Sequence, residues 1–151
     1  MSARVHSRSA VTIVAGAIAA LVVALPASAS GSFDRHFTVL SKDVAGHETT
    51  NGFAFRSVLL NPANPANRVG NSHVRCRFDR QSRKSRCRGV FHFDGTIGGF
   101  GDLLIKGNFG GRDHTGVVVD GDGEFTGRVA GKIFVHNINR RTTLIDFDLT
   151  R

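Results

Sequence analysis

Short apolar runs separated by turn-forming residues constrain this chain more than any other feature of its sequence. From Phe33 onward there are eight such runs, each rich in Phe, Val, Ile or Leu. They occupy residues 33–40, 53–60, 74–80, 86–93, 103–109, 117–119, 132–138 and 143–149. Gly, Asn, Asp or Pro residues interrupt the chain between them, and no segment of this region keeps a helical period. The pattern predicts eight short antiparallel β-strands.

The predicted strands fit one all-β domain better than any other architecture. Regularly spaced hairpins favour an eight-stranded antiparallel β-barrel, because closing the sheet leaves no strand edge exposed. Residues 61–67 contain Pro62 and Pro65, and we expect a loop there, with a single helical turn as the alternative.

Residues 1–29 have the pattern of a secretory signal peptide. Arg4 and Arg8 precede a 15-residue apolar run at residues 11–25, which is shorter than the roughly 20 residues of a membrane-spanning helix. Pro26 ends the run, and Ala27 and Ala29 are the small residues that signal peptidase requires. We therefore predict residues 1–29 as a signal peptide, residues 30–151 as a single β-barrel domain, and a secreted protein, extracellular or associated with the cell envelope. An uncleaved membrane anchor is the alternative.

Two cysteines predict a covalent staple in one hairpin. Cys76 and Cys87 have ten residues between them, and a hairpin with its tip at Gln81-Ser82 places them directly opposite each other. Thiols of exported proteins pair in the oxidising space outside the cell. A zinc site made with His73 and His92 is the competing interpretation. Both histidines lie at odd offsets from the cysteines, which puts them on the opposite face of an extended strand, so we predict a disulfide and no metal site.

The same hairpin is strongly basic. Residues 68–88 contain eight basic residues and one acidic residue. The disulfide register places Arg75 opposite Arg88 and Arg77 opposite Arg86 on one face, where like charges repel. These four arginines are candidate contacts for an anionic cell-envelope surface. The alternatives are a solvated hairpin tip or pairing with the acidic turn at residues 120–124. A single aromatic residue in the stretch, Phe78, argues against specific nucleic-acid binding.

The last predicted hairpin contains the candidate acid/base residues. A three-residue loop at 139–141 pairs Ile133 with Phe147 and Val135 with Ile145 on one face, and Lys132 with Asp148 and Phe134 with Asp146 on the other. His136 then neighbours Asp146. On a face lining the barrel interior, these two side chains would form an acid/base pair; on a face turned to solvent they would have no such role. We expect the remaining histidines of the mature chain to lie on the surface: His36, His47, His73, His92 and His114.

The order of several motifs resembles a known group of barrels. These motifs are Arg68-Val69-Gly70 before Cys76, Cys87-Arg88-Gly89-Val90-Phe91, Asp94-Gly95-Thr96-Ile97, and the glycine-rich stretch from Val118 to Gly131. Over residues 33–150 the chain is similar to the allene oxide cyclase-like and dirigent-like barrels. The resemblance implies a calycin-like eight-stranded antiparallel barrel, often a homotrimer. It also implies an apolar small molecule in the barrel interior, and ring closure or radical coupling without a cofactor.

Two functions fit these residues. The first is a secreted barrel that binds a hydrophobic small molecule and guides its cyclisation or coupling, with isomerase-like or cyclase-like chemistry. The second is a non-catalytic secreted domain that contacts anionic surfaces through the arginine-rich hairpin. The motifs of familiar hydrolases, such as Gly-x-Ser-x-Gly and His-Glu-x-x-His, are absent from the sequence. The twelve phenylalanines either line a cavity or fill the core, and this choice separates the two functions.

The signal-peptide pattern gives a direct test. Protein recovered from the culture medium of a secreting host should begin at Ser30, because cleavage follows Ala29. N-terminal sequencing with intact mass measurement reads the cleavage site. A mature protein that still begins at Met1 would contradict the prediction, and Ala29→Leu should block cleavage.

Overall fold

The computed structural model describes residues 35–81, 84–109, 113–126 and 130–150. The predicted signal peptide lies outside these residues, and its cleavage stays a prediction. Eight strands and one short 3-10 helix make up the described chain. They are β1 (Arg35–Thr49), β2 (Gly52–Asn61), β3 (Asn64–Asp79), β4 (Lys84–Asp94), β5 (Phe100–Phe109), β6 (Asp113–Gly121), η1 (Gly123–Phe125), β7 (Ala130–Asn139) and β8 (Thr142–Thr150).

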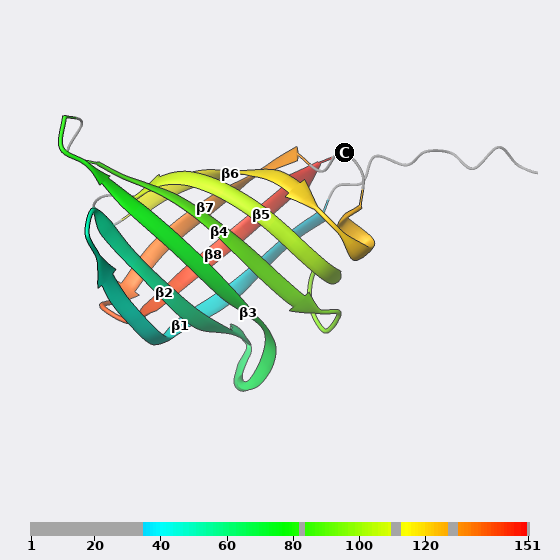
Figure 1. Cartoon of the computed structure of the whole chain (residues 1–151). Coiled ribbons are helices and arrows are strands. Elements are labelled where there is room, and N and C mark those ends of the chain that lie inside the picture. The colour runs from blue at the N-terminus through cyan, green and yellow to red at the C-terminus, as the bar shows by residue number, and fades with distance from the viewer. Residues whose placement is uncertain (1–34, 82–83, 110–112, 127–129, 151) are drawn as a thin grey trace, which may run out of the picture. The chain divides into compact units, whose positions relative to one another are not determined.

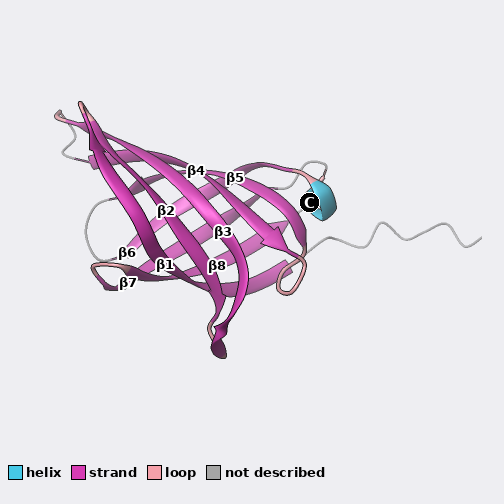
Figure 2. Cartoon of the chain, turned by 60° about the horizontal axis from the view of Figure 1, so that its bottom comes forward, coloured by secondary structure: helices cyan, strands magenta, loops and turns pink. Residues whose placement is uncertain are grey.

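The strands form a closed antiparallel barrel in which each strand pairs with its sequence neighbours (Figure 1). β1 closes the sheet by pairing with β8, from Arg35 opposite Leu149 to Lys42 opposite Thr142. Strands surround the interior on all sides, and the short helix lies at one end (Figure 2). The predicted fold class, an eight-stranded antiparallel β-barrel with one disulfide-stapled hairpin, is confirmed.

The strands are longer than the apolar runs that predicted them. β1 continues to Thr49 through a bulge at Val44, and β6 begins at Asp113 rather than at Val117. The expected loop at residues 61–67 is wrong in extent: only Pro62 and Ala63 form the turn, and β3 already begins at Asn64. Asn61 pairs with Asn64 and Leu60 with Arg68, so Pro65 lies in an irregular segment where its missing N–H removes no ladder hydrogen bond.

The stapled hairpin has the predicted register. Cys76 and Cys87 are opposite each other, bonded as a disulfide, with their Cα atoms 4.0 Å apart. Both are buried on the inner wall of the barrel. For a loop of this length the crosslink contributes about 3 kcal/mol to stability by restricting the unfolded chain.

The last hairpin also keeps its predicted pairing, with a different turn. Ile133 pairs with Phe147 and Val135 with Ile145, both facing inward. Asn139 pairs with Thr142, so the turn has two residues rather than three. A bulge at Ile138 compensates for the missing loop residue and preserves the register.

Phenylalanine side chains close one end of the barrel, which we call the closed end. Phe37, Phe93, Phe125 and Phe147 are buried there, and ring centroids in contact lie 4.9–5.8 Å apart. Phe125 comes from η1, so the turn between β6 and β7 supplies part of this stopper. Aromatic rings bury large areas and gain further from edge-to-face contact. The closed end is therefore solid core.

Arg35 joins two turns over this stopper. Its Nη1 atom donates to the Gly98 carbonyl at 2.6 Å and to Glu124 Oε2 at 3.1 Å. The guanidinium carbon also lies 5.9 Å from the centre of the Phe125 ring. One cation thus ties the start of β1 to the β4–β5 turn and to η1.

Hydrogen bonds within the β4–β5 turn lower one pKa. Bonds from the side chain and the backbone N–H of Thr96 hold the pKa of the Asp94 carboxyl below its ordinary value. A lowered folded-state pKa adds stability above the unfolded-state pKa of aspartate, and this stability is lost as pH falls through the folded value.

Gly98 offers a test of the stopper. Its φ is +73°, and a Cβ atom there would lie 2.6 Å from the Phe37 ring. We expect Gly98→Ala to lower the free energy of unfolding by about 1–3 kcal/mol, through overpacking and backbone strain. Urea unfolding measures this change. Gly46→Ala is the matched control, because its added methyl group would lie 3.5 Å from the Ala54 carbonyl oxygen, an ordinary contact distance. Equal losses in both variants would contradict the stopper contact.

Candidate functional site

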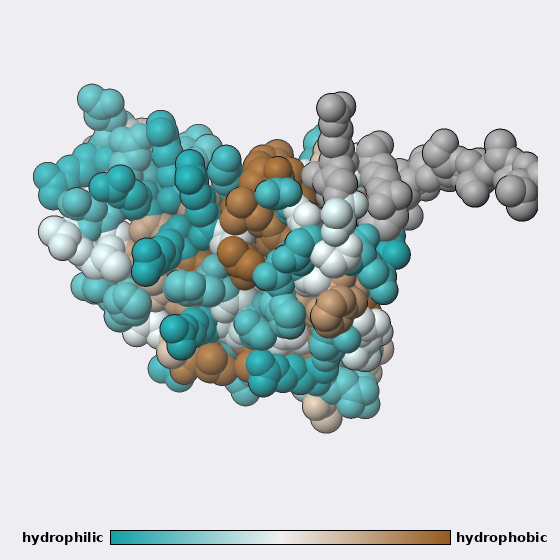
Figure 3. Space-filling model, turned by 45° about the vertical axis from the view of Figure 1, so that its right-hand side comes forward, coloured by the Kyte–Doolittle hydropathy of each residue, from teal (hydrophilic) through white to brown (hydrophobic). Residues whose placement is uncertain are grey.

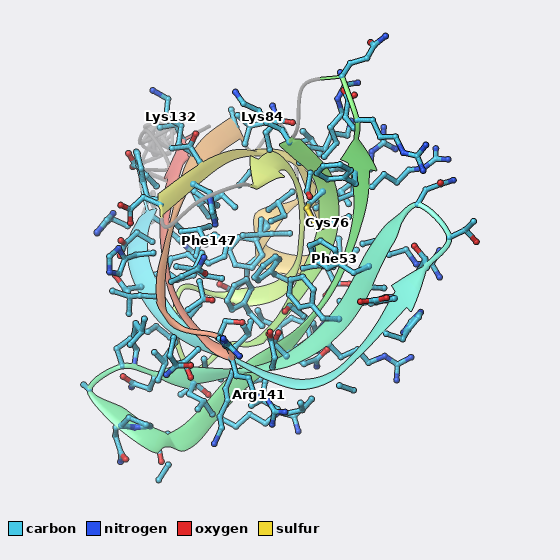
Figure 4. All side chains as sticks on the ribbon, turned by 90° about the vertical axis from the view of Figure 1, so that its left-hand side faces the viewer. Phe53, Cys76, Lys84, Lys132, Arg141 and Phe147 are labelled. Atoms are coloured by element: carbon cyan, nitrogen blue, oxygen red, sulfur yellow. A yellow bond between two sulfur atoms is a disulfide. The ribbon has the colours of Figure 1, made fainter. Side chains whose placement is uncertain are left out.

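A cavity of about 680 Å³ occupies the opposite end of the barrel, which we call the open end. The β1–β2, β3–β4 and β7–β8 turns surround this end (Figure 1). Figure 4 looks into it: Phe147 lies within the ring of strands, Phe53 and Cys76 lie on the wall, and Arg141 lies at the rim. The inward-facing phenylalanines therefore have two roles: the closed-end rings form core, whereas Phe53, Phe55 and Phe91 line the cavity.

The floor of the cavity is apolar. Seven inward-facing side chains from six strands contribute to it: Phe55, Val74, Phe91, Ile105, Ile133, Val135 and Ile145. They face inward because alternate residues of a strand point to opposite sides of the sheet. Such a floor favours binding of the apolar part of a molecule, because that part is removed from water.

A row of polar side chains crosses the inner wall among these apolar residues, and we call it the polar belt. Its members come from six adjacent strands: Ser72 on β3, Ser57 on β2, Asp43 on β1, Thr143 on β8, Asn137 on β7 and His114 on β6. The register aligns them, with Ser57 opposite both Ser72 and Asp43, and Thr143 opposite Asn137. Ser41, opposite Thr143, joins the two halves at the β1–β8 seam.

Hydrogen bonds hold most of the belt in place. Ser57 Oγ donates to Asp43 Oδ1 at 2.7 Å. On the other half, Thr143 Oγ1 donates to Asn137 Oδ1 at 3.1 Å. The Asn137 amide nitrogen then donates to His114 Nε2, also at 3.1 Å. Because an amide nitrogen only donates, Nε2 is the acceptor in this contact.

Ser72 differs from the rest of the belt. Its side chain is 3% exposed and lines the cavity, and its hydroxyl has no hydrogen-bond partner among the described residues. A buried hydroxyl without a partner costs free energy. A polar group of a bound molecule would supply the missing partner.

The sequence leaves two locations open for His136 and Asp146, the barrel interior or the solvent side. They share one face of the last hairpin, and that face is the outside of the barrel. His136 Nδ1 hydrogen-bonds the Asp113 carboxylate on β6, and Asp146 instead accepts from Thr38 Oγ1 on β1. The prediction missed Thr38 because β1 and β8 become neighbours only when the barrel closes. It missed Asp113 because β6 begins four residues before its predicted start at Val117.

His114 was expected on the surface, and the structure places it on the cavity wall. The available signal was strand alternation: His114, Gly116 and Val118 have the same parity and share the inner face. The apolar run predicted a strand beginning only at Val117, so this histidine fell outside it. His92 is exposed as expected, with its Nδ1 atom 2.5 Å from Asp102 Oδ1.

The four candidate anion-contact arginines lie together on the outer surface. Arg75 pairs with Arg88 and Arg77 with Arg86, as predicted. The acidic turn proposed as an alternative partner is elsewhere: Glu124 bonds Arg35, and Asp122 accepts from the Asp102 backbone at the closed end. Whether these arginines bind an anion stays a prediction.

The described residues contain neither a cluster of metal-ligating side chains nor a long apolar helix. Within residues 35–81, 84–109, 113–126 and 130–150, no three His, Cys, Asp or Glu side chains gather as a metal site. In the same ranges, no helix has the length and apolar character to cross a membrane.

Comparisons with known proteins support the fold. No family model matches the chain, and no curated protein matches its sequence. Among solved structures, pyocyanin demethylase is similar, with a TM-score of 0.62 and 16% sequence identity. The match covers 77% of this chain and all of that protein. At this identity the likeness shows a shared barrel fold.

Substitution of two opposed serines, Ser57 and Ser72, tests the hydrogen bonds of the polar belt. Ser57→Ala removes the hydrogen bond to the half-buried Asp43, and we expect it to lower the free energy of unfolding by about 1–2 kcal/mol. Ser72→Ala removes a hydroxyl that has no partner, so stability should stay the same or rise. Urea unfolding of both variants, with ligand-free protein, measures the difference. An equal loss from Ser72→Ala would mean that its hydroxyl is already satisfied.

Proposed function

We propose that the barrel binds a mostly apolar small molecule in the cavity at its open end. The observation that carries this proposal is the 680 Å³ cavity, whose lining combines the apolar floor residues with a belt of hydrogen-bonding groups. Small-molecule sites commonly have volumes of about 300–1,000 Å³, apolar walls and a few placed polar groups. The fold shared with a protein named as a pyocyanin demethylase also supports small-molecule binding.

The two parts of the site have different roles in this proposal. The floor removes the apolar body of the ligand from water, which supplies affinity. The belt fixes orientation, because the Ser72 hydroxyl and the side chains of Asp43 and His114 can each bond a polar substituent. Their hydrogen bonds to Ser57 and Asn137 hold two of these groups before the ligand arrives.

We further propose that the barrel guides its bound ligand through cyclisation or coupling without a cofactor. The resemblance to allene oxide cyclase-like and dirigent-like barrels implies this chemistry. A flexible molecule held in one folded conformation has lost most of its ordering entropy before the reaction. The glycine-rich stretch from Val118 to Gly131 supports this assignment, although residues 127–129 lie outside the described structure.

A cavity-filling variant tests binding. Val135 is 6% exposed and lines the cavity, so Val135→Trp should reduce the available volume. We expect affinity for the neutral apolar probe N-phenyl-1-naphthylamine to fall about tenfold or more, measured by the fluorescence of the probe during titration.

The matched control is Val119→Trp, on the outer face of β6 with 37% exposure, which should leave affinity unchanged. Circular dichroism confirms that both variants fold. Failure of the parent protein to bind the probe, or equal binding by both variants, would overturn the proposal.

A further inference from the structure

Cations form a row across the outside of the barrel. Arg75 on β3, Arg88 on β4 and Lys106 on β5 are successive register partners. Val117 on β6 follows Lys106, and Lys132 on β7 follows Val117. Arg77 and Arg86 lie one row closer to the open end. We call these six basic residues the outer cationic face. Its four arginines are those that the hairpin register predicted together, and closure of the sheet adds the two lysines.

Exposed apolar side chains lie among these cations. Val117 separates two lysines and is 49% exposed, while Val90 on β4 is 42% exposed. Phe134 on β7 is 46% exposed and lies in the same register row as Arg77 and Arg86. Figure 3 shows that hydrophobic side chains, in brown, are exposed among hydrophilic ones on the face that it presents. All three line one broad groove together with the cations, with a volume of about 1480 Å³.

Carboxylates lie at the edges of this face: the described register partners of Arg75, Arg88 and Lys106 include none, whereas Asp148 on β8 is opposite Lys132. Arg86 forms an ion pair with Asp79 at 3.4 Å, and the Arg86 side chain is 76% exposed. Such an exposed pair contributes little. Arg75 and Arg88 therefore repel each other, and an external anion bound between them would reduce this repulsion.

We infer that the outer cationic face docks the barrel onto an anionic lipid bilayer. The cations match anionic headgroups, which attract basic residues near the membrane surface. The exposed Val90, Val117 and Phe134 match the boundary between headgroups and acyl chains. A soluble polyanion would use the cations and leave the apolar side chains without a role, so the mixture favours a bilayer. This inference is independent of ligand binding in the cavity.

Vesicle sedimentation tests the inference. We expect the protein to sediment with vesicles of phosphatidylcholine and phosphatidylglycerol, and to stay in solution with vesicles of phosphatidylcholine alone. Replacing two opposed cations, Arg75→Gln with Arg88→Gln, should weaken binding about tenfold or more. The matched control, Lys42→Gln with Arg141→Gln, removes two charges elsewhere and should leave binding within about twofold.

A second pair of variants separates a bilayer from a polyanion. Val117→Ser with Phe134→Ser keeps every charge, and we expect it to weaken vesicle binding about tenfold, because the apolar anchors are lost. Phe100→Ser with Ile138→Ser, which replaces apolar residues of similar exposure elsewhere, should have little effect. Circular dichroism checks folding of each variant, and all substitutions are on exposed positions.

The inference is overturned if anionic vesicles do not bind the protein. It is also overturned if Val117→Ser with Phe134→Ser binds vesicles as the parent does while soluble polyphosphate binds both proteins equally. That second result would identify the face as a polyanion site.

Discussion

Pairing between β1 and β8 is the constraint on which the rest of the structure depends. This seam joins strands from the two ends of the described chain, and it turns an eight-stranded sheet into a barrel with an inside and an outside. Once closed, strand alternation decides the location of every side chain. It also brings Ser41 next to Thr143, which makes two short polar rows into one belt.

The two ends of the barrel differ because phenylalanine is distributed unevenly. Four rings and η1 fill the closed end, and Arg35 holds the turns over them. At the open end Phe53, Phe55 and Phe91 stand on the wall beside smaller or polar side chains such as Ser72 and Thr143, and the interior between them is the cavity. A rigid base beneath an open cavity is an arrangement that keeps binding groups in place.

Local pairing was predictable from the sequence, and long-range neighbours were not. The registers of the β3–β4 and β7–β8 hairpins follow from Cys76 opposite Cys87 and from matching apolar positions. The polar belt, by contrast, depends on the order of six strands around the barrel. His114 illustrates the difference: its strand began earlier than its apolar run, and its partner Asn137 is 23 residues away. Arg35 similarly bonds Gly98 and Glu124, which no local pattern connects to it.

The disulfide separates the two faces of its own hairpin. Cys76 and Cys87 bond on the inner wall, while the residues beside them in sequence point outward. The crosslink keeps the strands together without help from those outward side chains. Natural variation could thus exchange arginine for other residues at these sites, changing what the exterior recognises while the wall of the cavity stays intact. The outward side chains of this hairpin can therefore change during evolution, and the surface specificity with them, while the disulfide keeps the backbone in place.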